Sequence, residues 1–102
     1  MEFYSFRFGD MKVAQADPAS QKLIAVEMSL GFKAPGRPAV EALELTVHVP
    51  QDEAKSVAAT QREAYAAAQA LLGAAADYVR SRSCEALAEE TEKNRAFAVK
   101  AS

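Results

Sequence analysis

The first half of this chain alternates apolar and polar side chains, and this alternation constrains the fold more than any other feature. Every second side chain between residues 23 and 32 is apolar, and the same pattern recurs between residues 43 and 49. Successive side chains of a β-strand point to opposite faces, so a period of two predicts strands that bury one face. The apolar members are Ile24, Val26, Met28, Leu30 and Phe32 in the first run, and Leu43, Leu45, Val47 and Val49 in the second.

The N-terminal segment predicts two further strands, joined at Gly9 and Asp10. A two-residue loop that begins with glycine suits a type II′ hairpin turn. With this turn Phe8 would face Met11, and the other aromatic and aliphatic side chains of the segment would share their face. The loop at residues 33–39, which holds two prolines and a glycine, separates the last two strands. The sequence therefore predicts a four-stranded antiparallel β-meander.

From residue 52 the pattern changes to that of a helix. Residues 52–82 contain eleven alanines, one glycine and no proline, so helix propensity is high throughout. Asp52 and Glu53 carry the charge that a helix N-terminus favours, and Arg80 and Arg82 carry the charge that a C-terminus favours. We therefore expect one long α-helix that packs on one face of the sheet.

Two sides of this predicted helix are candidates for contact. Spacing by seven residues gives an apolar stripe that includes Tyr65, Leu72 and Val79, and we expect it to be buried on the sheet. A helix of this length would span about 46 Å and extend beyond the sheet, unless it bends or breaks at Gly73. Small side chains line a second side and would let another helix approach closely, which favours a homodimer or a larger closed oligomer. The candidate self-association surface consists of Ala59, Ala66, Ala67, Ala70 and Ala74.

A short C-terminal helix is expected to follow, with Ser83 as its cap and Glu85 in its first turn. The fold class is therefore α+β: a four-stranded antiparallel meander, a long helix on one sheet face and a short C-terminal helix. We expect residues 1–82 to form a single ββββα domain and residues 83–102 to form a loosely held helical extension.

Charge and cysteine content exclude several classes of protein. The 14 acidic and 12 basic residues give a net charge of −2, which is not the basic excess of a protein that binds many phosphates. Cys84 is the only cysteine, so an intrachain disulfide and a zinc site built on thiolates are excluded, and a reducing compartment is favoured. No apolar stretch approaches the ~20 residues of a membrane span, and the first residues do not resemble a secretion signal. We expect a cytoplasmic protein that does not contact a membrane.

Catalytic motifs are not apparent in the sequence. His48, the only histidine, falls on the polar face of its strand near Glu44. A surface position is the simpler interpretation, although a general-base role is the alternative. Cys84 at a helix start could be a reactive thiol, but a pair with His48 would require distant segments to meet. The four glycines are isolated, so no phosphate-binding loop is present. We expect no enzyme, no catalytic residue, no cofactor and no metal.

The function predicted from these patterns is that of a small non-enzymatic interaction module, such as an adaptor, assembly component, chaperone or inhibitor. It would act as a homo-oligomer through the alanine-rich helix, with a further, unidentified protein partner as an option. The alternative is a single-stranded nucleic-acid-binding protein that uses the open face of the sheet, where Arg7 and Lys12 would be cross-strand neighbours. Acidic residues on the same face would repel phosphate, so nucleic acid is the less favoured partner. A third option is an enzyme whose site forms between subunits. The residues of the alternative binding face are Phe3, Arg7, Lys12 and His48.

Overall fold

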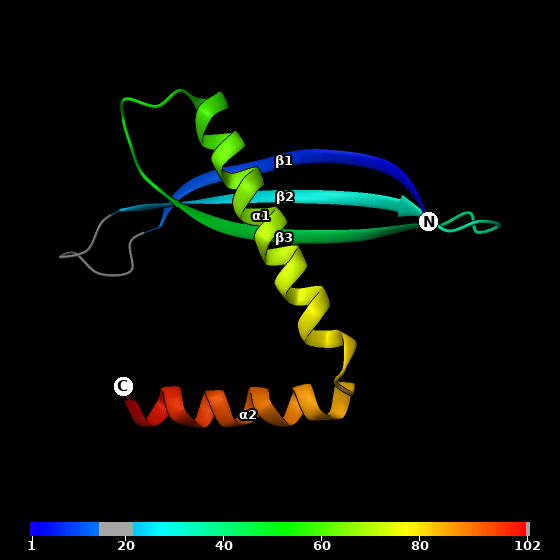
Figure 1. Cartoon of the computed structure of the whole chain (residues 1–102). Coiled ribbons are helices and arrows are strands. Elements are labelled where there is room, and N and C mark those ends of the chain that lie inside the picture. Colours follow the sequence, from blue (N-terminus) through cyan, green and yellow to red (C-terminus); the bar gives the residue numbers. More distant parts are fainter. Residues whose placement is uncertain (15–21, 102) are drawn as a thin grey trace. The chain divides into compact units, whose positions relative to one another are not determined.

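The computed structural model describes residues 1–14 and 22–101 and shows an α+β fold. Three antiparallel strands in the order β1-β2-β3 are followed by two helices (Figure 1). The chain divides into two compact units, Met1–Ala70 and Leu71–Ser102. The elements are β1 (Glu2–Ala14), β2 (Leu23–Lys33), β3 (Val40–Pro50), α1 (Val57–Arg80) and α2 (Cys84–Ala101).

The predicted hairpin at Gly9 and Asp10 is wrong, because β1 continues through these residues as one strand. The sheet of the described segments therefore has three strands rather than four. Phe8 pairs with Met28, and Met11 pairs with Val26. Between these two pairs β1 advances by three residues and β2 by only two. This is a β-bulge with one extra residue. A one-residue bulge shifts the alternation of side chains just as a two-residue turn does, and the apolar pattern alone could not distinguish them.

The two edges of the sheet differ in regularity. β1 carries the bulge after Phe8 and a second irregularity between Phe3 and Ser5. A Cβ added to Gly9 would lie 3.2 Å from the Cβ of Glu27, so the bulge brings the two backbones close together. The pairing of β3 with β2, in contrast, runs without interruption along the full length of both strands. One edge strand is therefore bulged and the other is regular.

The core lies between one face of the sheet and α1, whose path crosses the strands (Figure 1). The helix contributes only small side chains to it. Ala64 is fully buried, Ala68 nearly so, and Thr60 is also buried. These three residues are four apart and form one line on the helix surface, where their small size lets the helix backbone approach the sheet. The buried apolar residues are Val26, Met28, Val47, Val49, Ala64 and Ala68.

The prediction that the apolar stripe of the helix is buried is wrong for Tyr65 and Val79. Tyr65 is 45% exposed and Val79 is 52% exposed, while Leu72 is partly buried. The alanine line, rather than the line of large residues, faces the sheet because the strands already supply the large side chains. Tyr65 lies at the margin of this contact, where its ring meets that of Phe6 edge to face at 5.6 Å.

α1 begins later than the charge pattern predicts. The Oγ of Ser56 accepts a hydrogen bond from the backbone N–H of Ala59 at 3.1 Å and caps the helix. Asp52, predicted at the helix start, instead accepts a hydrogen bond from the N–H of Ala54 at 2.9 Å in a preceding turn. The helix has 24 residues, about 36 Å. It continues unbroken through Gly73.

The second unit contains the break between the helices that the sequence predicts. The Oγ of Ser83 accepts a hydrogen bond from the N–H of Ala86 at 3.1 Å, which confirms Ser83 as the cap of α2. Residues 81–83 separate the end of α1 from the start of α2. Tyr78 near the end of α1 donates a hydrogen bond to Glu90 of α2 at 2.5 Å. The guanidinium of Arg82 lies over the Tyr78 ring at 3.6 Å.

Candidate functional site

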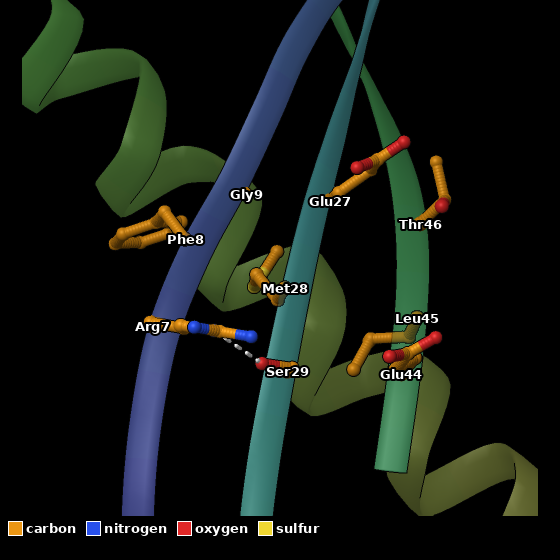
Figure 2. A pocket seen from close by; sticks show the side chains of 9 residues that line it. All are labelled: Arg7, Phe8, Gly9, Glu27, Met28, Ser29, Glu44, Leu45 and Thr46. Atoms are coloured by element: carbon orange, nitrogen blue, oxygen red, sulfur yellow. Dashed lines mark hydrogen bonds between the residues drawn. The ribbon is translucent and has the colours of Figure 1, made fainter.

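A hollow of about 540 Å³ lies on the open face of the sheet, opposite α1 (Figure 2). All three strands contribute to it. Arg7 comes from β1, and its Nε donates a hydrogen bond to the Oγ of Ser29 on β2 at 3.3 Å. The small Gly9 at the bulge forms part of the wall. The other polar side chains of the hollow are Glu27, Glu44 and Thr46.

The charges of this hollow do not suit a phosphate backbone. Arg7 and Glu44 both flank Ser29 in the register of the sheet, and Glu27 adds a second carboxylate to the same lining. All three charged side chains are exposed to solvent. One guanidinium therefore shares an open surface with two carboxylates, and carboxylates repel a phosphate chain.

The four residues of the alternative binding face are not brought together. Arg7 and Lys12 are not cross-strand neighbours as predicted, because both lie on β1. Their partners on β2 are four residues apart, about 13 Å along the strand. His48 is exposed and flanks Ala25 on the side opposite Lys12.

Phe3 belongs to the apolar face rather than to the open one. It pairs with Phe32 on β2, and the two rings meet edge to face with centroids 6.0 Å apart. Paired residues of neighbouring strands point to the same face, and Phe32 alternates in phase with the buried Met28. The irregularity of β1 before Ser5 moves Phe3 out of phase with Arg7, which alternation in an unbroken strand does not predict.

Cys84, the candidate reactive thiol, lies in the first turn of a helix. Cys84 is an exposed free thiol at the start of α2. The pKa of Glu85 is lowered, chiefly by its own backbone N–H and next by the thiol of Cys84. Such hydrogen bonds are those of a helix N-terminus. Within residues 1–14 and 22–101, no group of three or more His, Cys, Asp or Glu side chains is placed to hold a metal ion. None of the helices in this described part is both long and apolar enough to span a membrane.

The predicted self-association surface divides into two parts. Ala66, Ala70 and Ala74 are exposed and, being four residues apart, form one line along the helix. Ala59 and Ala67 are partly buried, and Ala67 packs against the core. The exposed line is therefore the part of this surface that is accessible to a partner.

Large apolar side chains remain exposed on the helix-covered face. Leu43 and Val13, which the sequence assigned to the core, are 42% and 57% exposed, and Phe3, which it assigned to the open face, is 63% exposed. A helix is about 10 Å wide and β3 alone is about 36 Å long, so α1 covers only part of this face. The sequence contains three long strands but only one helix to cover them, and this imbalance could have indicated that some positions stay uncovered.

An apolar groove of about 310 Å³ runs beside α1 on the same side of the sheet. The rings of Phe6 and Phe8 meet edge to face at 5.0 Å and form its wall together with Tyr65. Ala58, Gln61 and Arg62 from α1 complete the lining. The groove adds to the apolar surface that the single chain leaves accessible.

Comparisons with known proteins leave the function to be argued from these surfaces alone. No protein-family profile matches the chain, and no curated protein and no solved structure is significantly similar to it.

Proposed function

We propose that this chain is a non-enzymatic interaction module that self-associates through α1 and through the apolar sheet residues that α1 leaves uncovered. The observation that carries the proposal is the exposure of Leu43 and Phe3, at 42% and 63%, on the face of the sheet that also builds the core. Exposed apolar groups on such a face lose contact with water when another chain covers them.

The packing within the chain indicates what kind of surface fits there. Ala64 and Ala68 pack on large side chains of the strands. The exposed line of Ala66, Ala70 and Ala74 presents a second surface of the same kind. In a dimer the alanine line would pack closely against a partner helix or a partner sheet. A two-fold symmetric dimer is the simplest closed arrangement.

Within this proposal, the module acts as an adaptor, assembly component, chaperone or inhibitor in the cytoplasm. An exposed single cysteine, Cys84, suits a reducing compartment because a free thiol on the surface is open to oxidation elsewhere. A heterologous protein partner would meet the same exposed apolar residues.

The test uses charged substitutions on the proposed surface. Ala70→Glu places a charge on the exposed alanine line, and Leu43→Glu places one on the uncovered apolar face. Ala76→Glu is the matched control, since Ala76 is exposed on α1 but lies away from that line. Ala67 is unsuitable, because it packs against the core.

Light scattering behind a size-exclusion column should show a dimer or larger species for the parent chain and for Ala76→Glu. Ala70→Glu and Leu43→Glu should lower the mass at equal concentration, with circular dichroism unchanged. The proposal fails if the parent chain is a monomer at every concentration. It also fails if all three variants keep the mass of the parent.

A further inference from the structure

We propose that the self-association is mediated by β3, which pairs antiparallel with β3 of a second copy around a two-fold axis at Thr46. Two three-stranded sheets would thereby join into one sheet of six strands. This inference rests on the proposed self-association and names its interface.

β3 is an edge strand whose geometry suits such pairing. Within the described part of the chain, β2 is its only neighbour. The backbone N–H and C=O groups that point away from β2 form a row that can pair with another strand. β3 has 11 residues in uninterrupted register, whereas the register of β1 is interrupted near its start and again near its middle. Bulges are one of the ways in which proteins prevent an edge strand from pairing with another chain. β1 has such bulges, and β3 has none.

The alternation of β3 permits a symmetric pairing with itself. When the two-fold axis passes at a residue, directly opposite side chains point to the same face of the joined sheet. Apolar side chains then lie opposite apolar ones and polar opposite polar. An axis midway between two residues would place apolar side chains opposite polar ones.

Charge selects among the residue-centred registers near the middle of β3. An axis at Glu44 would place the two copies of its carboxylate opposite each other, which is unfavourable. An axis at Leu45 would place Glu44 opposite Thr46 and leave His48 opposite Ala42. An axis at Thr46 places Glu44 opposite the partner's His48, and symmetry repeats this pair. The register centred on Thr46 is therefore the one with complementary side chains.

The same register covers apolar surface that the single chain exposes. Leu43 would lie opposite the partner's Val49, and Leu45 opposite the partner's Val47. Because the two-fold axis stands perpendicular to the joined sheet, the α1 helices of both copies lie on the same face. The exposed alanine line of each helix is then on the face where the partner's helix also lies.

Disulfide trapping tests this register directly, in a background where Cys84→Ser removes the native thiol. In Thr46→Cys the two cysteines would be directly opposite, with Cβ atoms about 4.5–5.5 Å apart, within reach of a disulfide after a small adjustment. In Glu44→Cys the two cysteines would be offset by four residues, about 13 Å, which is too far. Lys12→Cys on the open face of β1 measures random collision.

Mild oxidation and a non-reducing gel should give roughly tenfold more covalent dimer for Thr46→Cys than for either control, because only that pair meets the distance requirement. Equal cross-linking of all three variants, with the dimer mass retained in light scattering, would overturn the edge pairing and leave the proposed self-association intact. Preferential cross-linking of Leu45→Cys would overturn the register. A monomeric parent chain would overturn both proposals.

A charge exchange supplies an independent test of the same register. His48→Glu would place Glu44 opposite a second carboxylate and should weaken the dimer. Glu44→Lys combined with His48→Glu places opposite charges across the axis and should recover the dimer. The assignment of this pair is contradicted if the double variant dissociates as readily as His48→Glu alone.

Discussion

The ring of Tyr65 on α1 meets the ring of Phe6 on β1 edge to face, with centroids 5.6 Å apart and planes at 87°. This contact marks the margin of the helix–sheet interface, because Tyr65 remains 45% exposed while the preceding residue, Ala64, is fully buried. The centre of the interface thus has room only for small helical side chains.

Enlarging Ala64 should therefore destabilise the fold. Ala64→Leu adds three carbon atoms between α1 and the sheet and should lower the free energy of unfolding by about 1–3 kcal/mol, the usual cost of overpacking a core. Urea denaturation followed by circular dichroism measures the change. Ala76→Leu, at an exposed position of the same helix, is the control and should change stability little. Equal stability of the two variants would contradict the packing described here.

The cap of α1 gives a second stability prediction. Ser56→Ala removes the hydroxyl that accepts a hydrogen bond from the N–H of Ala59, and it should cost about 1 kcal/mol. Ser81→Ala is the control, since Ser81 is an exposed serine in the break between the helices, two residues before the cap of α2. Chemical denaturation of both variants tests the assignment, which fails if Ser81→Ala is the more damaging change.

Tyr78 provides a pH-dependent signal within the second unit. Its pKa is raised above 10, first by the hydrogen bond to Glu90, then by desolvation and by the charge of that carboxylate. Glu90→Gln should therefore lower the pKa of Tyr78, as measured by the ultraviolet absorbance of the phenolate. Glu89→Gln is the matched control because Glu89 pairs with Lys93 instead.

The sign of the accompanying stability change follows from the direction of this shift. A tyrosine whose pKa is raised in the folded state stabilises that state fully below its unfolded pKa, near 10, and the stabilisation is lost as pH rises through the folded value. The helical circular dichroism signal of the parent chain should decrease in that alkaline range. The decrease should be smaller in Glu90→Gln. An unchanged phenolate titration in Glu90→Gln would show that Tyr78 and Glu90 do not pair.

Single-stranded nucleic acid should not bind the open face of the sheet. Arg7 shares its hollow with Glu27 and Glu44, and Lys12 lies about 13 Å further along β1. Fluorescence anisotropy of labelled oligonucleotides should therefore stay flat even at low salt, where contacts with phosphate are strongest. A rise in anisotropy that disappears with added salt and with Arg7→Ser would restore the nucleic-acid-binding alternative.

Local periodicity was sufficient to predict most of the secondary structure. The alternation in β2 and β3 is confirmed, as are the helical second half and the cap at Ser83. These features depend on neighbouring residues, whose spacing and chemistry are visible in the sequence. The bulge at Gly9 was not predicted, because a turn and a bulge give the same apolar spacing between Phe8 and Met11.

The surfaces were harder to predict than the elements, since they depend on tertiary contacts. The pattern of large residues on α1 suggested that Tyr65 and Val79 would be buried, but the strands fill the core with their own large side chains and leave room for alanine. The placement of Phe3 depends on an irregularity in β1 that no turn residue marks. The uncovered Leu43 follows from the ratio of one helix to three long strands, a property of the whole unit.

The measurement that tests the central claim most directly is the molar mass of the intact chain in solution, by light scattering at two concentrations. The proposed self-association predicts a mass of at least twice the 11.0 kDa of one chain, with Leu43→Glu moving toward the monomer. A mass of one chain at both concentrations would contradict the claim and would leave the exposed apolar residues of the sheet without the partner proposed here.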